Sequence, residues 1–187
     1  MILTLIKTLT ASNSDTLSFV DGSSSVVLDS TYDEYMFVFT DIGPANDGVH
    51  FGFQVNATDD AGGGYDTSLM TTTQHRAWQG EASATVEGPE YQTGYDLAQS
   101  AARQLLVQDL ENDSDSSCAG ILHLFSPSST TYVKHFYSRF NSVTGTATAS
   151  NDVYITGYIN DTTAIDEIRF EMSDGNFDGV IQLYGIA

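Results

Sequence analysis

The sequence predicts an all-β protein, an antiparallel β-sandwich of jelly-roll type that residues 1–187 form as a single domain. Short segments in which apolar and polar residues alternate recur along the whole chain, as expected of strands with one buried face. Turn sequences rich in Gly, Asn, Asp and Ser separate these segments. Alternating helical segments, which a parallel α/β sheet would need, are missing from the pattern.

In the N-terminal half, alternation predicts five strands, over residues 2–6, 16–20, 25–28, 34–40 and 49–55. Residues 34–40 are almost continuously apolar or aromatic, which is typical of a central strand buried on both faces. The turn sequence of residues 43–48 predicts that the strand after it folds back as a hairpin. Residues 57–64 are polar and glycine-rich, and we expect an exposed loop there.

The middle of the chain is harder to interpret. Strand residues are expected around Met70 and Trp78, and residues 80–94 are irregular enough to predict the longest surface excursion. Residues 97–110 allow two interpretations. Leu97, Ala101 and Leu105 have helical spacing, but the neighbouring segments are strands, which favours a strand with a short helical turn before it.

The C-terminal third has the clearest pattern. Residues 121–125 and 132–140 predict a hairpin around the turn of residues 126–129. Alternation then predicts strands over residues 153–159 and 165–172, and a last strand over residues 180–186. In residues 165–172, Ile168, Phe170 and Met172 fall on one face of the strand, and the charged residues between them fall on the other.

The chain is strongly acidic, with 25 acidic and 6 basic residues and a formal net charge of −19. Binding to nucleic acid requires a basic patch, which six scattered cations do not form. An anionic membrane surface would repel the chain for the same reason. We therefore expect neither partner, and we expect a well-solvated protein that tolerates saline medium.

The single cysteine, Cys118, excludes an intrachain disulfide and a cysteine-based zinc site. The apolar run at the N-terminus is too short for a signal peptide, and no stretch approaches the about 20 apolar residues that span a bilayer. These features predict a protein made in a cytoplasm and not exported by this route.

The sequence offers one local motif for a metal ion. Asp174, Asn176 and Asp178 alternate around Gly175, as in the first half of an EF-hand calcium loop. The twelfth position of that loop is Gly185, where calcium would need a bidentate Glu, and the flanking residues alternate as strands. A hairpin turn between residues 170–172 and 180–183 explains the same residues, so no cofactor is predicted and Ca²⁺ remains the alternative.

The sequence predicts no enzyme. The four histidines are scattered, and none has the spacing of a zinc ligand pair. Neither a Gly-x-Ser-x-Gly nucleophile elbow nor a phosphate-binding loop is present. Aromatic residues in or near loops are candidates for contact with a partner or a glycan, namely Tyr65, Trp78, Tyr91 and Tyr95. The alternative is that these rings cap the ends of the core.

Several segments together are distinctive, above all residues 163–170 (TAIDEIRF), 173–177 (SDGNF) and 183–186 (LYGI). Residues 5–8, 18–22, 32–35 and 128–135 extend the pattern over nearly the whole chain. In these segments the chain resembles virion-associated structural proteins of marine and cyanobacterial tailed bacteriophages. The resemblance implies a jelly-roll-like module displayed on a capsid or tail, usually as a homo-oligomer. It brings no active-site residues.

From these observations we expect a virion protein that decorates or cements the outside of the capsid as a homo-trimer or other homo-oligomer, bound to the major capsid protein or other virion proteins. The first strand, with Ile2, Leu3, Leu5 and Ile6, is a candidate for pairing with a neighbouring chain. It is equally well explained as an edge strand of its own domain. The alternative function is a tail- or head-fibre module that binds host surface glycans.

Overall fold

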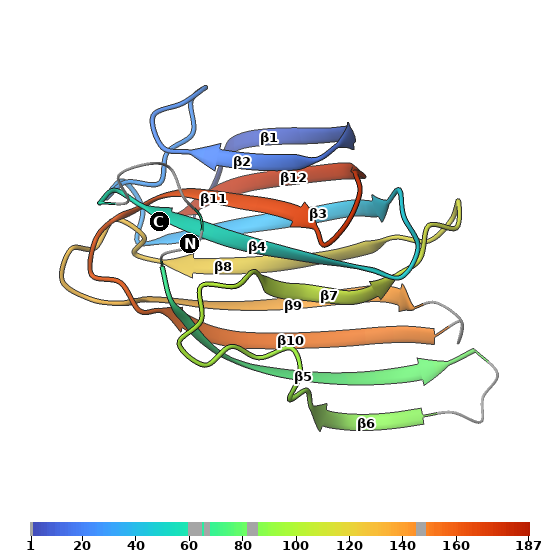
Figure 1. Ribbon diagram of the computed structural model, residues 1–187. Coiled ribbons are helices and arrows are strands. Elements are labelled where there is room, and N and C mark those ends of the chain that lie inside the picture. The colour runs from blue at the N-terminus through green and yellow to red at the C-terminus, as the bar shows by residue number, and fades with distance from the viewer. Residues whose placement is uncertain (1, 60–64, 66–67, 82–85, 145–148) are drawn as a thin grey trace.

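More than half of the chain folds into β-strands. The computed structural model describes residues 2–59, 65, 68–81, 86–144 and 149–187, and within them it contains twelve strands and no helix (Figure 1). The strands are β1 (Leu3–Ser14), β2 (Thr16–Val20), β3 (Glu34–Pro44), β4 (Val49–Ala57), β5 (Met70–Gly80), β6 (Val86–Tyr91), β7 (Gln104–Leu110), β8 (Cys118–Phe125), β9 (Lys134–Thr144), β10 (Ala149–Ile159), β11 (Ile165–Met172) and β12 (Phe177–Ile186). The described part of the chain holds no helix that could cross a membrane.

The strands form two antiparallel sheets. The large sheet has the order β1-β12-β3-β8-β9-β10-β5-β6, and the small sheet has the order β2-β11-β4-β7. A single residue pair, Leu110 of β7 with Thr144 of β9, links the two sheets by strand pairing.

The order of the strands is that of a jelly roll, which confirms the predicted fold class. β1-β12-β3-β8 face β2-β11-β4-β7, and the chain crosses between the sheets from β1 to β2, β3 to β4, β7 to β8 and β11 to β12. These four crossings lie at the same end of the sandwich, at the right in Figure 1, and we call this the corner end. The pairs β5-β6 and β9-β10 widen the large sheet beyond the jelly roll.

Phenylalanine rings fill the space between the sheets. Phe170 of β11 lies opposite Phe37 and Phe39 of β3, with ring centroids 5.4 and 5.0 Å apart. Both contacts are edge-to-face, the arrangement that the ring quadrupole favours. The inward positions of β11 are those expected from the sequence, since Ile168, Phe170 and Met172 are all buried. Cys118 is buried too, and burial raises the pKa of its thiol.

Two predicted hairpins are wrong. β3 pairs with β12 and β8, whereas β4 pairs with β11 and β7, so the turn of residues 43–48 joins strands of opposite sheets. In the same way, the connection from β11 to β12 crosses the sandwich and is no hairpin turn. A turn sequence indicates that the chain reverses direction, but it carries no information about which sheet receives the next strand.

Four further predictions from the sequence can be compared with the structure. Residues 25–28 form no strand, although Val26 and Leu28 are buried in the core. Residues 80–94 include β6, where the sequence predicted an irregular excursion. The ambiguous segment resolves as the favoured strand, β7, without a helix before it. The hairpin of β8 and β9 is confirmed.

Candidate interaction surface

The outer face of the large sheet, the side turned away from the small sheet, spans eight strands, and no described strand covers it. The strand register places its side chains in rows across the sheet. One row consists of Tyr184, Met36, His123, Tyr137, Thr156 and Thr73. The next row consists of Gln182, Val38, Ile121, Arg139, Tyr154, His75 and Tyr91.

This outer face is nearly neutral, although the chain carries a formal charge of −19. Residues 116–151, which include β8 and β9, contain no Asp or Glu. Two acidic side chains, Glu34 and Asp152, lie in the rows that flank these two rows, and both have partners. Glu34 contacts Nδ1 of His123. Asp152 accepts two hydrogen bonds of 2.9 Å from the Arg139 guanidinium, a bidentate geometry.

Aromatic and histidine rings meet in pairs across the strands of the outer face. His123 stacks on Tyr137 with ring centroids 4.5 Å apart, and His75 meets Tyr91 edge-on at 5.2 Å. Tyr154 stands between these pairs and exposes 44% of its surface. Rings with an apolar body and a polar edge are the side chains that most often anchor protein interfaces.

Two open hollows indent the outer face. One has a volume of about 420 Å³ and is lined by residues of four strands, among them Thr73, Phe125, His135, Tyr137 and Tyr158. The second has a volume of about 560 Å³ and lies beside Ile121 and the Arg139–Asp152 pair. Such hollows can receive side chains of a partner or a small polar ligand.

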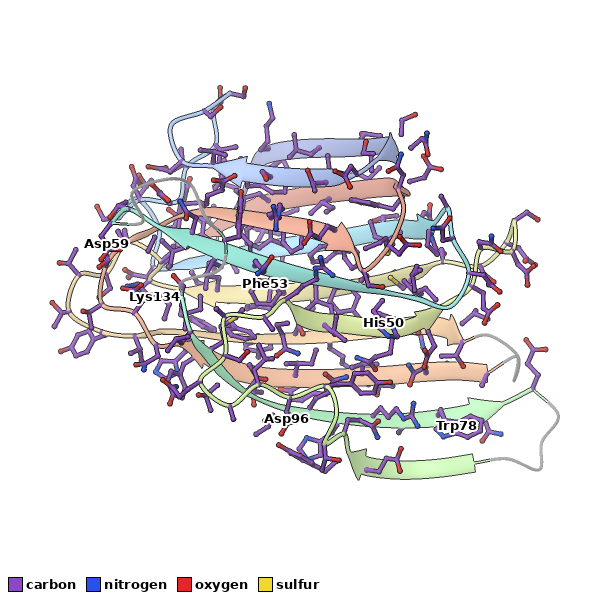
Figure 2. The ribbon with its side chains drawn as sticks, in the orientation of Figure 1. His50, Phe53, Asp59, Trp78, Asp96 and Lys134 are labelled. Atoms are coloured by element: carbon purple, nitrogen blue, oxygen red, sulfur yellow. The ribbon has the colours of Figure 1, made fainter. Side chains whose placement is uncertain are left out.

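Of the four aromatic residues singled out in the sequence, only Tyr91 belongs to the outer face. Its hydroxyl donates a hydrogen bond of 2.5 Å to Asp96, and this bond raises the pKa of Tyr91. Trp78 lies toward the C-terminal end of β5 (Figure 2). It shares a side of the sheet with Arg76, because the two residues are two positions apart on one strand.

Tyr65 and Tyr95 lie elsewhere. The Arg169 guanidinium sits 4.1 Å from the centroid of the Tyr65 ring, on the outer side of the small sheet. The Tyr95 carbonyl accepts a hydrogen bond from the buried Gln104 amide, and its ring lies 6.0 Å from that of His50. The fold therefore does not gather the four aromatics into one site.

The sequence interpretation missed the aromatics that do share a face. Tyr137, Tyr154 and Tyr158 alternate with the buried residues of β9 and β10. Alternation within each strand would have placed these tyrosines outward, but only the strand order brings the two strands together.

A charged cluster on the outer side of the small sheet has a structural explanation. Glu171 accepts a hydrogen bond of 2.9 Å from Nε of Arg103 and lies 3.2 Å from Nε of Arg169. The carboxylate is largely buried, and two guanidinium groups compensate its charge. The cluster ties β11 to the segment before β7.

The candidate calcium residues hold the corner end together. Asp174 accepts a hydrogen bond of 2.7 Å from Asn46, and Asp178 accepts one of 2.7 Å from the Asn13 backbone N–H. The Asn176 amide donates to the Asn13 carbonyl at 2.9 Å. Among the residues described, no group of three or more His, Cys, Asp or Glu side chains is placed to hold a metal ion.

The strand proposed for pairing with a neighbour is an edge strand of the large sheet. Leu3 and Leu5 of β1 expose 49% and 51% of their surfaces, and Ile2 before it exposes 69%. Ile6 is different, because it lies at a bulge in β1 and packs against the core.

Comparison with models of protein families, with curated proteins and with solved structures finds no match.

Proposed function

We propose that the chain is a structural protein of a bacteriophage particle, and that it attaches to the outside of the capsid through the outer face of its large sheet. The observation that carries the proposal is the near-neutral, aromatic outer face on a chain with a formal charge of −19. The resemblance of the sequence to phage virion proteins supplies the setting, and the jelly-roll fold is compatible with it.

The charge distribution supports docking through this face. The cores of protein interfaces are depleted in charged residues and enriched in Tyr, Met and similar side chains. Docking through the corner end would bring its acidic loops against the partner and would require their desolvation. With the outer face docked on the major capsid protein or another virion protein, most of the acidic residues remain in solvent.

The test of this proposal uses phage particles assembled with variants of the chain. Tyr154→Glu places a charge in the middle of the outer face, and Ser114→Glu adds the same charge to an exposed loop at the corner end as the control. We expect Tyr154→Glu to lower the number of copies per particle at least about tenfold, since a buried unpaired charge is costly. Quantitative mass spectrometry of purified particles measures this number.

Cryo-electron microscopy of the same particles gives the orientation of the chain. Density that shows the outer face of the large sheet against the shell supports the proposal. Wild-type copy numbers for Tyr154→Glu, or particles without the chain, would contradict it.

A second candidate function is a fibre module that binds host surface glycans. The hollow beside Tyr137, Tyr158 and His135 favours it, because flat rings with polar edges also stack on sugars. The two functions differ in copy number, on the order of hundreds per particle for shell decoration and about six to a few dozen for a fibre. Binding on a glycan array that Tyr158→Ala abolishes would favour the fibre.

A further inference from the structure

The N-terminal strand β1 offers a free edge to solvent. It runs for 12 residues and pairs on one side with β12, and no strand in the described part of the chain pairs with its other side. Ile2 and Ala187 exchange both backbone hydrogen bonds, at 2.9 and 3.1 Å. In an antiparallel ladder, bonded and non-bonded pairs alternate. The backbone groups of Leu3 and Leu5 therefore point away from β12.

Beyond the bulge in β1, alternate residues of this strand also direct their backbone groups away from β12. The register shift lies between Leu5 and Lys7 and leaves the alternation of β12 intact. The residues of β12 opposite Thr8 and Thr10 are Gln182 and Val180, which are out of phase with Ala187 and so direct their backbone groups toward β3. Thr8 and Thr10 thus present at the free edge N–H and C=O groups that pair with no described strand.

The two edges of the large sheet differ in their protection against pairing. The opposite edge, β6, contains Glu87, Pro89 and Glu90, and a proline and charges are the features that block edge-to-edge association. β1 contains no proline and no acidic residue over residues 3–14. Its one charged residue, Lys7, donates a hydrogen bond of 3.0 Å to the Ser24 carbonyl.

We propose that β1 pairs antiparallel with β1 of a second copy of this chain across a two-fold axis. Two copies, each with a formal charge of −19, repel each other wherever acidic loops meet. Residues 1–14 contain no Asp or Glu, so this edge allows close approach. An antiparallel pair of identical strands is also self-complementary, as a two-fold interface requires.

Pairing would join the two large sheets into one continuous sheet. Leu3 and Leu5, which flank the outer face beside Ile186 and Tyr184, would then lie near the seam between the copies. The outer faces of both copies would become one surface. A two-fold pair yields a dimer or an even-numbered assembly, which is a homo-oligomer as expected from the sequence but not the trimer.

The mass of the isolated chain in solution tests the pairing. Sedimentation velocity should give twice the chain mass of 20.2 kDa. Added sodium chloride should shift the equilibrium toward the dimer, because it screens the repulsion between the acidic copies.

Two variants and two matched controls locate the interface. Thr8→Pro removes a backbone donor from the free edge without removing a bond to β12, and Thr8→Val retains that donor. Leu5→Glu places acidic groups at the seam, and Ser114→Glu adds the same charge at the corner end. We expect the dissociation constant to rise at least tenfold for Thr8→Pro and Leu5→Glu and to stay within about twofold for the controls. Far-ultraviolet circular dichroism verifies that each variant is folded.

A chain that is monomeric at every salt concentration, a trimer, or a dimer that both Thr8→Pro and Leu5→Glu leave intact would overturn the inference. If one variant fails to fold, the other still decides. These measurements use the isolated chain without phage particles. A result that contradicts the dimer therefore does not contradict the proposed docking through the outer face.

Discussion

At the scale of single residues, Tyr35 shows how the core constrains a polar group. Its side chain is fully buried in β3, and its hydroxyl donates a hydrogen bond of 2.8 Å to the Asp29 carbonyl. Burial raises the pKa of Tyr35 to about 12, because the phenolate would lose its hydration. Asp29 and Asp21 add electrostatic repulsion of the ionised form.

This raised pKa makes the stability of the fold depend on pH in a defined window. Below about pH 10 the hydroxyl is protonated in both states. Between pH 10 and pH 12 the unfolded chain loses the proton and the folded chain keeps it, so the free energy of unfolding falls as pH rises. We expect Tyr35 to contribute a decrease of about 2 kcal/mol across this window.

The variant Tyr35→Phe isolates this contribution from those of the other tyrosines. It lacks the titrating group and should cost about 1 kcal/mol near neutral pH through the lost hydrogen bond. Urea unfolding at about pH 8 and about pH 11 should show a steeper loss of stability in the wild type than in the variant. Parallel losses would show that Tyr35 does not titrate in this window.

At the scale of elements, β7 carries two buried glutamines with opposite surroundings. The Gln104 side chain accepts a hydrogen bond of 2.6 Å from Thr72 and donates one of 3.1 Å to the Tyr95 carbonyl. The amide nitrogen and oxygen of Gln108 have no hydrogen-bond partner among the residues that the structure describes. Both side chains are at most 1% exposed.

The two glutamines should therefore respond differently to the same substitution. Gln104→Leu removes the acceptor of the Thr72 hydroxyl proton and the amide that donates to the Tyr95 carbonyl, and we expect a loss of about 2–4 kcal/mol in the free energy of unfolding. Gln108→Leu removes unpaired polar atoms from the interior, and we expect no loss or a gain of about 1 kcal/mol. Urea denaturation compares the two variants. A loss of similar size for Gln108→Leu would show that water bonds its amide.

The strands also show how much of the fold can be predicted from the sequence. Alternation located most strands, and the inward side of β11 was predicted correctly from Ile168, Phe170 and Met172. The pairing of β3 with β12 could not be predicted, because it joins residues more than a hundred positions apart in the sequence and depends on which sheet each strand enters. Local turn chemistry therefore predicted hairpins where the chain crosses the sandwich.

The candidate surface was predictable only in part for the same reason. Tyr91 and the exposed Leu3 and Leu5 were identified from the sequence, because this requires only the polarity of the neighbouring residues. The rows that join Tyr137 and Tyr154 to them arise from the order of eight strands. A choice of aromatics by their position in loops selected Tyr65 and Tyr95, which the fold places on the other sheet or beside it.

At the scale of the whole molecule, the acidic residues are unevenly distributed. Of the 25 acidic residues, six lie in the strands of the large sheet, namely Glu34, Asp41, Glu87, Glu90, Asp152 and Asp178. The connections at the corner end carry many of the others, including Asp15, Asp47, Glu111, Asp113, Asp115 and Asp174. Like charges held close together on folding oppose the folded state.

This crowding predicts that salt stabilises the fold. Raising sodium chloride from about 10 mM to about 500 mM shortens the screening length several-fold, and we expect the melting temperature to rise by about 5 °C. The double variant Asp113→Asn with Asp115→Asn should melt higher at low salt and respond less to added salt. Differential scanning calorimetry measures both effects.

A comparison of ions separates screening from specific binding at the corner end. Calcium chloride and magnesium chloride at matched ionic strength should raise the melting temperature equally if the effect is screening. A saturable increase with calcium alone would indicate a site that uses the corner carboxylates. A melting temperature that does not change with sodium chloride would show that the acidic side chains at the corner end are far enough apart to be solvated independently. Charge repulsion at other surfaces would then no longer explain why the chain docks through its outer face.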